Sequence, residues 1–214
     1  MKGLKRLVCV TTTTALAACG GGGGPNTINT SATSTGILLD AAVDGISYKT
    51  ATQSGVTANG GKFSYIAGEI VNFSLGSIML PSVTAGAKIT PFDIAGSTDI
   101  NNDKVVNLLV FLQSIDEDGN PTNGISINEA TRTSAKNSID FSASKAAFRV
   151  LPALTNVIVA ARGPGAEPVS EALAAMHFQR TIAAEGLTAS NTNSAAVTQQ
   201  QNATVVTSAA LTIF

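Results

Sequence analysis

The sequence predicts an α+β fold, in which a small β-sandwich is followed by several helices and the ends are flexible. Residues 36–82 hold short apolar stretches separated by turn signals at the roughly 8–12-residue spacing typical of small sandwiches. Between residues 103 and 186, apolar side chains recur instead at helical spacing. We therefore expect one α+β domain over 36–186, with its β part at 36–82 and its helical part at 103–186.

Residues 1–18 have the three parts of a secretory signal peptide. A basic start precedes a short apolar stretch from Leu7 to Leu16, and the small residues Ala17 and Ala18 follow. This stretch is too short for a permanent membrane-spanning helix, which takes roughly 20 apolar residues. We therefore expect this segment to be cleaved from the mature protein.

The tetrapeptide Leu16-Ala17-Ala18-Cys19 resembles the lipobox of bacterial lipoproteins. The resemblance implies cleavage before Cys19, lipidation of its thiol and anchoring to a membrane through that lipid. An ordinary secretory signal with an accidental cysteine is the alternative. Gly20 stands where an aspartate would indicate inner-membrane retention. The expected location is therefore the outer membrane of the cell envelope, with the periplasmic and surface faces both open.

Composition excludes several classes of function. The sequence has 13 basic and 14 acidic residues, and three of the basic ones lie in residues 1–18, so the remainder carries 10 − 14 = −4. A mildly acidic chain without a basic cluster is not expected to bind nucleic acid. No later segment has the length of a transmembrane helix, which argues against a channel or permease. Cys9 leaves with the signal and lipid consumes Cys19, so no thiol remains for a disulfide, a zinc site or a nucleophile.

Residues 19–35 form a Gly/Ser/Thr-rich linker that carries the lipid at its first residue. It buries too little apolar surface to offset its ordering entropy, so we expect a flexible spacer between lipid and domain. At the other end, residues 187–214 contain no charged residue. We expect a polar tail there, with one terminal strand.

The β part is predicted from alternation and turn residues. Asn59-Gly60-Gly61 is a strong turn signal, because Asn and Gly tolerate positive φ. Phe63 and Tyr65 follow on one face of the next strand. Further strands are expected at Ile37–Leu39, Val43–Tyr48, Ile70–Leu75 and Ile78–Leu80.

Two family resemblances concern this region. Val43–Tyr48, Thr57–Tyr65 and Gly68-Glu69 look like the carboxypeptidase-regulatory or transthyretin-like β-sandwich. Residues 36–125 also resemble an N-terminal module of uncharacterised proteobacterial surface lipoproteins, through Thr90–Gly96 and Asn107–Ile125. The second resemblance implies an envelope location and a β-plus-helix module, but no chemistry.

Four helical segments are predicted further along. Apolar residues at helical spacing predict a helix over 103–115, capped by Asp103 and with Asn107 and Ser114 opposite its apolar face. Ser126–Glu129 has the spacing of a capping box for a short helix. Residues 143–160 are expected to be helical in pieces, broken or begun at Pro152. The last helix should run from Pro168 to Glu185 and end at Gly186.

One turn is a candidate calcium site. Asp116, Asp118 and Asn120 occupy positions 1, 3 and 5 of a glycine-containing loop, which lets alternate oxygen-bearing side chains converge on a hard cation such as Ca²⁺. The EF-hand pattern then fails, because Ile127 replaces the bidentate glutamate. The alternative is a solvated acidic turn. No other cofactor is expected.

The sequence favours a non-enzymatic role. His177 is the only histidine, and nearby Ser170 and Glu171 lack the G-x-S-x-G elbow and the oriented base of a hydrolase. We therefore expect an envelope lipoprotein with a structural or surface-interaction role and an envelope protein or glycan as partner. The alternative is an accessory module that binds extracellular polysaccharide for a secreted hydrolase system. The chain is poorly supplied for sugar stacking, with no Trp and two Tyr.

Overall fold

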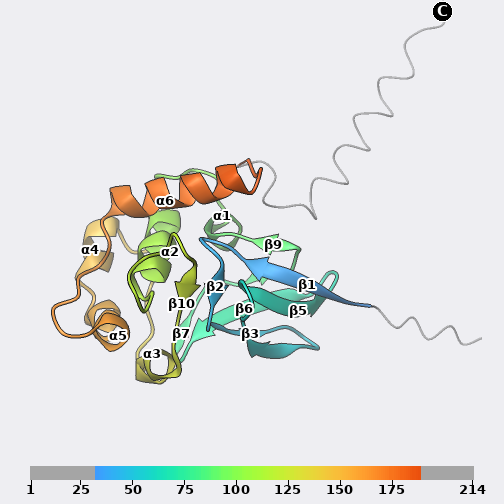
Figure 1. The fold of residues 1–214 in the computed structure, drawn as a ribbon, viewed down its shortest axis with the longest axis horizontal. Helices are drawn as coiled ribbons and strands as arrows, with labels where there is room; N and C mark the ends of the chain where they lie inside the picture. Colours follow the sequence, from blue (N-terminus) through green and yellow to red (C-terminus); the bar gives the residue numbers. More distant parts are fainter. Residues whose placement is uncertain (1–31, 189–214) are drawn as a thin grey trace, which may run out of the picture. The chain divides into compact units, whose positions relative to one another are not determined.

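The computed structural model describes residues 32–188. The expected signal peptide, the expected lipidation site at Cys19 and the expected terminal strand lie outside the described residues. The fold is α+β, as predicted, and Figure 1 shows its strands and helices. The strands of the described range are β1 (Thr33–Leu38), β2 (Val43–Asp44), β3 (Ser47–Lys49), β4 (Ser54–Val56), β5 (Lys62–Ile66), β6 (Ile70–Leu75), β7 (Ile78–Met79), β8 (Val83–Thr84), β9 (Lys88–Ile89) and β10 (Ile125–Ser126).

The strands form two larger sheets and one short pair. Strand β1 lies between β5, to which it is antiparallel, and β9, to which it is parallel. The second sheet has the order β4-β3-β6-β7, with β8 also paired to β6. Phe63 of the first sheet meets Phe73 of the second edge-to-face, with ring centroids 5.2 Å apart. This packing of aromatic side chains between the sheets is consistent with a β-sandwich.

Two features that the sequence predicts in the β part, a turn and a strand with one buried face, are present in the structure. Asn59, Gly60 and Gly61 have φ values of 56°, 87° and 76°, in the left-handed region that Asn and Gly tolerate. In β5, Phe63 and Tyr65 are buried while the residues between and beside them are more exposed. The expected turn and the expected two-sided strand are both confirmed.

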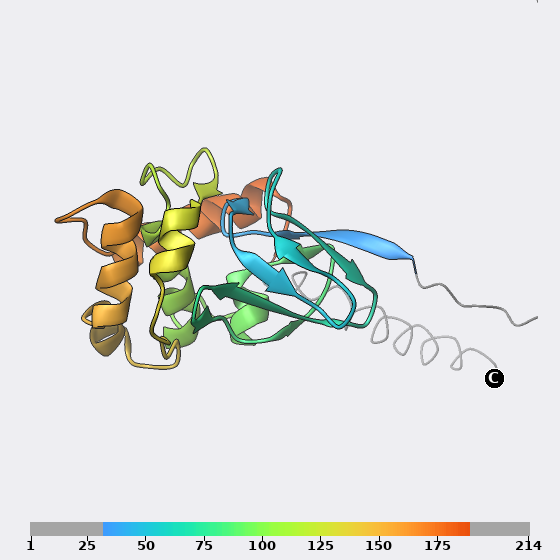
Figure 2. The same ribbon diagram turned by 90° about the horizontal axis from the view of Figure 1, so that it is seen from below.

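The helices are α1 (Pro91–Ala95), α2 (Asp103–Ser114), α3 (Glu129–Ser134), α4 (Lys145–Arg149), α5 (Pro152–Arg162) and α6 (Glu171–Ala184). Figures 1 and 2 show α2 to α6 gathered beside the strands, and α6 packs against α2. Pro152 is in the first turn of α5, and Gly186 follows α6 with a φ of 62°, as expected. None of the helices in residues 32–188 is long and apolar enough to span a membrane.

Helix α2 confirms the predicted helix over 103–115 but not its polar face. Every residue from Val105 to Ser114 is buried. Asn107 Nδ2 donates to the carbonyls of Phe141 and Ala143, at 3.0 and 2.8 Å. Ser114 Oγ accepts from the Val169 N–H at 2.9 Å. Backbone groups from later segments thus replace water as hydrogen-bond partners, which offsets the desolvation cost of burying these polar side chains.

Three helix starts differ from prediction. Asn102, not Asp103, caps α2, with its Oδ1 accepting from the N–H groups of the next turn. Asn128 caps α3, because Ser126 belongs to β10. Helix α6 begins at Glu171, with Ser170 as its cap. Pro168 precedes this helix, and its carbonyl and that of Val169 accept hydrogen bonds from Arg149.

Two expected boundaries also need correction. Residues 33–35, placed in the linker, belong to β1 and pair with β5. Strands also occur beyond residue 82, where β9 pairs with β1 and β10 pairs with β2. The chain therefore does not divide into a β part at 36–82 and a helical part at 103–186.

Candidate functional site

The predicted calcium loop follows α2, and its first residues are hydrogen-bonded to Ser126, beyond the end of the loop. Asp116 Oδ1 accepts from the Ser126 N–H at 2.9 Å, and the Glu117 N–H donates to the Ser126 carbonyl at 2.9 Å. Ser126 ends β10, which pairs in parallel with β2 so that Ser126 lies opposite Asp44. This pairing brings an acidic residue from early in the chain beside the loop.

Asp44 has a structural role of its own. Its Oδ1 accepts from the N–H groups of Gly60 and Gly61, at 3.1 and 2.6 Å. These two glycines lie in the positive-φ turn before β5. The N–H groups of this turn therefore both point at the Asp44 carboxylate. The carboxylate is half-buried and retains lone pairs for further partners.

A hollow of about 370 Å³ contains three carboxylates, those of Asp44, Asp116 and Asp118. The predicted ligands Asp116 and Asp118 therefore share one site, whereas Asn120 does not line it. Asn120 Oδ1 instead accepts from the Thr122 hydroxyl at 2.5 Å. The full lining is Ala42, Asp44, Gly60, Asp116, Asp118, Asn123, Gly124, Ile125 and Ser126.

The two loop carboxylates have opposite environments. Asp116 is 0% exposed, and its buried Oδ2 has no hydrogen-bond partner. Burial raises the pKa of Asp116; the Ser126 hydrogen bond opposes this shift and the neighbouring Asp118 adds to it. Asp118 is exposed, and hydrogen bonds from the Asn123 side chain and the Asn120 N–H lower its pKa. Without a cation, a proton is therefore held at Asp116 more readily than at Asp118.

The described residues contain no set of three or more His, Cys, Asp or Glu side chains arranged to hold a metal ion. Asp44 thus shares the hollow with the loop pair but does not complete a three-carboxylate cage. A cation here would be held by the Asp116–Asp118 pair together with neutral oxygen donors.

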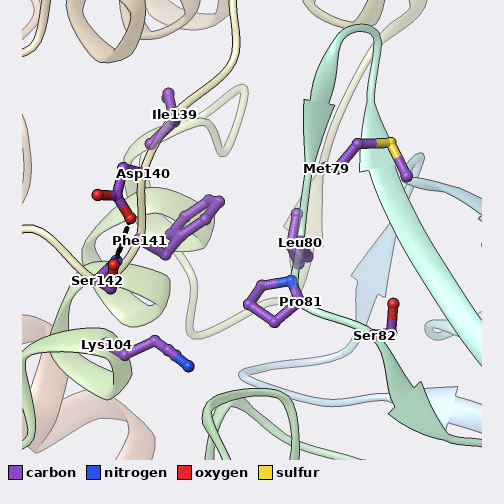
Figure 3. Close-up of a pocket in the computed structure, with 9 residues that line it drawn as sticks. All are labelled: Met79, Leu80, Pro81, Ser82, Lys104, Ile139, Asp140, Phe141 and Ser142. Atoms are coloured by element: carbon purple, nitrogen blue, oxygen red, sulfur yellow. Dashed lines mark hydrogen bonds between the residues drawn. The ribbon is translucent and has the colours of Figure 1, made fainter.

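A second hollow, of about 310 Å³, lies where β7 and the chain after it face residues 139–142 and α2 (Figure 3). Lys104 extends from α2 toward it, and Asp140 bonds to the neighbouring Ser142. Hydrogen bonds from Ser142 are the main cause that lowers the pKa of Asp140, with a further contribution from Lys104. Phe141, the aromatic residue of this lining, is 4% exposed and offers little ring surface for stacking.

The hydrolase-like residues near the chain's histidine have structural roles. Ser170 Oγ accepts from the Leu173 N–H as the cap of α6. His177 lies within the same helix, where its Nε2 is 3.5 Å from the Thr181 hydroxyl. Burial lowers the pKa of His177, and Arg180 lowers it further. Both effects favour the neutral form of the His177 imidazole over the charged form.

Comparison of the chain with protein-family models, with curated proteins and with solved structures finds no match. The lipobox and the two module resemblances therefore stay predictions from the sequence. The site's chemistry has to be argued from its own residues.

Proposed function

We propose that this chain is a lipid-anchored protein of the bacterial cell envelope, with a structural or interaction role that does not involve catalysis. The observation that carries the proposal is the order of segments before the domain. A basic start, an apolar stretch and Leu16-Ala17-Ala18-Cys19 come directly before a glycine run. That order is typical of a secreted chain cut at a cysteine.

The start of the described domain supports the anchoring arrangement. Strand β1 begins at Thr33 and pairs with β5 from Thr33 to Ile37. The segment between Cys19 and Thr33 would then serve as the spacer, shorter than its composition alone predicted. We infer that the first strand ties the spacer to a hydrogen-bonded sheet, so that a pull on the lipid reaches the core through β1.

Several polar side chains of types that can take part in catalysis instead make hydrogen bonds that stabilise the fold, which supports a non-catalytic role. Gln113 Nε2, on α2, donates to Asp40 Oδ1 and to the Ala174 carbonyl, both at 3.0 Å. It thereby joins the chain after β1 to α2 and α6. Ser170 and Asn107 are likewise committed to a helix cap and to two backbone carbonyls.

The aromatic residues give less support to the polysaccharide-binding alternative. Sugar recognition of the expected kind needs exposed aromatic faces. Within residues 32–188, the phenylalanines and Tyr65 are at most 8% exposed, and only Tyr48 is half-buried. We therefore do not propose that alternative.

Cys19→Ser tests the anchor, and the chain provides a matched control in Cys9→Ser. Cells expressing each form would be labelled with a clickable palmitate analogue, fractionated and partitioned in a phase-separating detergent. We expect the wild type and Cys9→Ser to carry label and to enter the outer-membrane and detergent fractions. Cys19→Ser should lose both properties, since it lacks the lipid acceptor. Unchanged labelling and partitioning of Cys19→Ser would refute the proposal.

A further inference from the structure

The acidic hollow concentrates negative charge that no described ion pair compensates. Asp44, Asp116 and Asp118 line it, and its other lining residues are uncharged. The ion pairs of the described range join Lys88 to Glu185 and Lys145 to Asp103, so they involve none of these carboxylates. Like charges held together in this way favour either a bound proton or a bound cation.

Asp116 provides an independent indication of a ligand. It is 0% exposed, and its Oδ1 accepts a hydrogen bond from the Ser126 N–H. The other oxygen, Oδ2, is buried without a partner. A buried acceptor in this state costs free energy unless a proton, water or metal ion satisfies it. Asp116 is one of the residues that line the hollow.

We propose that Asp116 and Asp118 bind a calcium ion in this hollow, with Asp44 adding negative charge beside it. The donors are all oxygen atoms, which hard cations prefer, and neither His nor Cys lines the site. Calcium completes six to eight ligands with carbonyl oxygens and water in irregular geometry, so a pair of carboxylates suffices for weak binding. Magnesium requires a smaller and nearly octahedral shell, which an open loop supplies poorly.

This ligand set differs from the one that sequence spacing predicts. Asn120 points its amide oxygen at Thr122, so it is not part of the set. Asn123 is the amide that lines the hollow, and its Nδ2 donates to Asp118 Oδ2 at 2.8 Å. That bond holds Asp118 in place while leaving lone pairs on both of its oxygens. Calcium is thus held by a loop already ordered by its own hydrogen bonds.

The test is a thermal melt of the purified full chain in chelator, in about 10 mM CaCl₂ and in about 10 mM MgCl₂. A Kd on the order of 10⁻⁴–10⁻³ M, as in weak extracellular sites, would shift the folding equilibrium about 10- to 100-fold. For a domain of this size the melting temperature should rise by about 3–10 °C. Magnesium should produce less than half of that rise.

Asp118→Asn and Glu117→Gln make a matched pair, because each removes one carboxylate from an exposed position of the same loop. Glu117 does not line the hollow. We expect Asp118→Asn to lose the calcium response and Glu117→Gln to retain it. Asn120→Ala should also retain it, since the amide of Asn120 lies outside the site. Isothermal titration with CaCl₂ alone gives the affinity of each variant without relying on unfolding.

Three results would overturn the proposal. One is an equal melt in calcium and in chelator, which would leave Asp116 as a protonated acid. Another is an equal loss of response in Glu117→Gln and Asp118→Asn, which would indicate general charge screening. The third is an equal response to calcium and magnesium. None of these outcomes bears on lipid anchoring, which Cys19→Ser tests separately.

Discussion

Phe178→Ala tests whether helix α6 is held to the domain mainly by one side chain. Of the residues in α6, only Ala174 and Phe178 are buried, and both are 0% exposed. The ring of Phe178 meets that of Phe92, in α1, at 5.0 Å between centroids and an interplanar angle of 73°. Because Ala174 is small and Ile182 is only partly buried against the core, Phe178 is the largest fully buried side chain of α6.

The expected loss of stability follows from this burial. Truncation of a fully buried phenylalanine typically costs about 3–5 kcal/mol, which includes the cavity that it leaves. The edge-to-face pair with Phe92 accounts for roughly 0.5–1.5 kcal/mol beyond area burial. At about 2–4 °C per kcal/mol for a domain of this size, a loss near 4 kcal/mol lowers the melting temperature by about 8–16 °C.

The assay is urea denaturation followed by circular dichroism, with Leu173→Ala as the control. Leu173 lies on the same helix but is 56% exposed, so its truncation should change the unfolding free energy by less than about 0.5 kcal/mol. Hydrogen exchange should also show that the amides of α6 exchange faster in Phe178→Ala. Similar losses in the two variants would refute the idea that this one ring secures the helix.

Two further predictions concern a glycine and a buried acid. Gly45→Ala should lower the unfolding free energy by about 1–3 kcal/mol more than Gly60→Ala does. Both glycines have positive φ, but of the two only Gly45 has a neighbour, the Ile127 carbonyl, with which an added Cβ would collide. Equal urea midpoints of the two variants would contradict this. Burial raises the pKa of Asp40, although the Gln113 hydrogen bond opposes the shift. A raised folded-state pKa means that stability is fully present below the unfolded pKa of about 3.9 and is lost as the pH rises through the folded value. The wild type should therefore lose stability relative to Asp40→Asn as the pH rises, and parallel profiles of urea midpoint against pH would count against this.

Features set by neighbouring residues were predictable from the sequence. The turn at Asn59–Gly61 needs only residues that accept positive φ, and its three backbone angles confirm it. The alternation of β5 and the helical spacing of α2 also follow from the chain itself. The helix caps were less predictable, because Asn102 and Asp103 are both good capping residues one position apart.

The burial of polar residues in α2 could not be predicted in the same way. Asn107 and Ser114 suggest a solvent face, yet their partners are backbone groups of Phe141, Ala143 and Val169. Those partners come from segments far along the chain, with no signal in the helix's own periodicity. Tertiary contacts therefore reversed what the local pattern favoured.

Part of the candidate site could be predicted from neighbouring residues, and part depends on contacts between distant segments. Spacing within one loop identified Asp116 and Asp118, and also pointed to Asn120, which the structure turns aside. Asp44 was missed as a site residue because it sits in an ordinary strand pattern. Only the pairing of β2 with β10 brings it to the loop, and neither two-residue strand has a distinctive sequence.

The parallel pairings of β1 with β9 and of β2 with β10 constrain the order in which the chain can fold. Each joins an early strand to one that is made much later, and β10 follows the whole of α2. Contacts between distant segments close large loops and slow folding. A chain that emerges N-terminus first can pair strands β3, β4 and β6 early. Strand β2, however, gains its partner only after residues 125 and 126 have emerged. During that interval β2 and the edge of β1 that meets β9 are unpaired and available for aggregation.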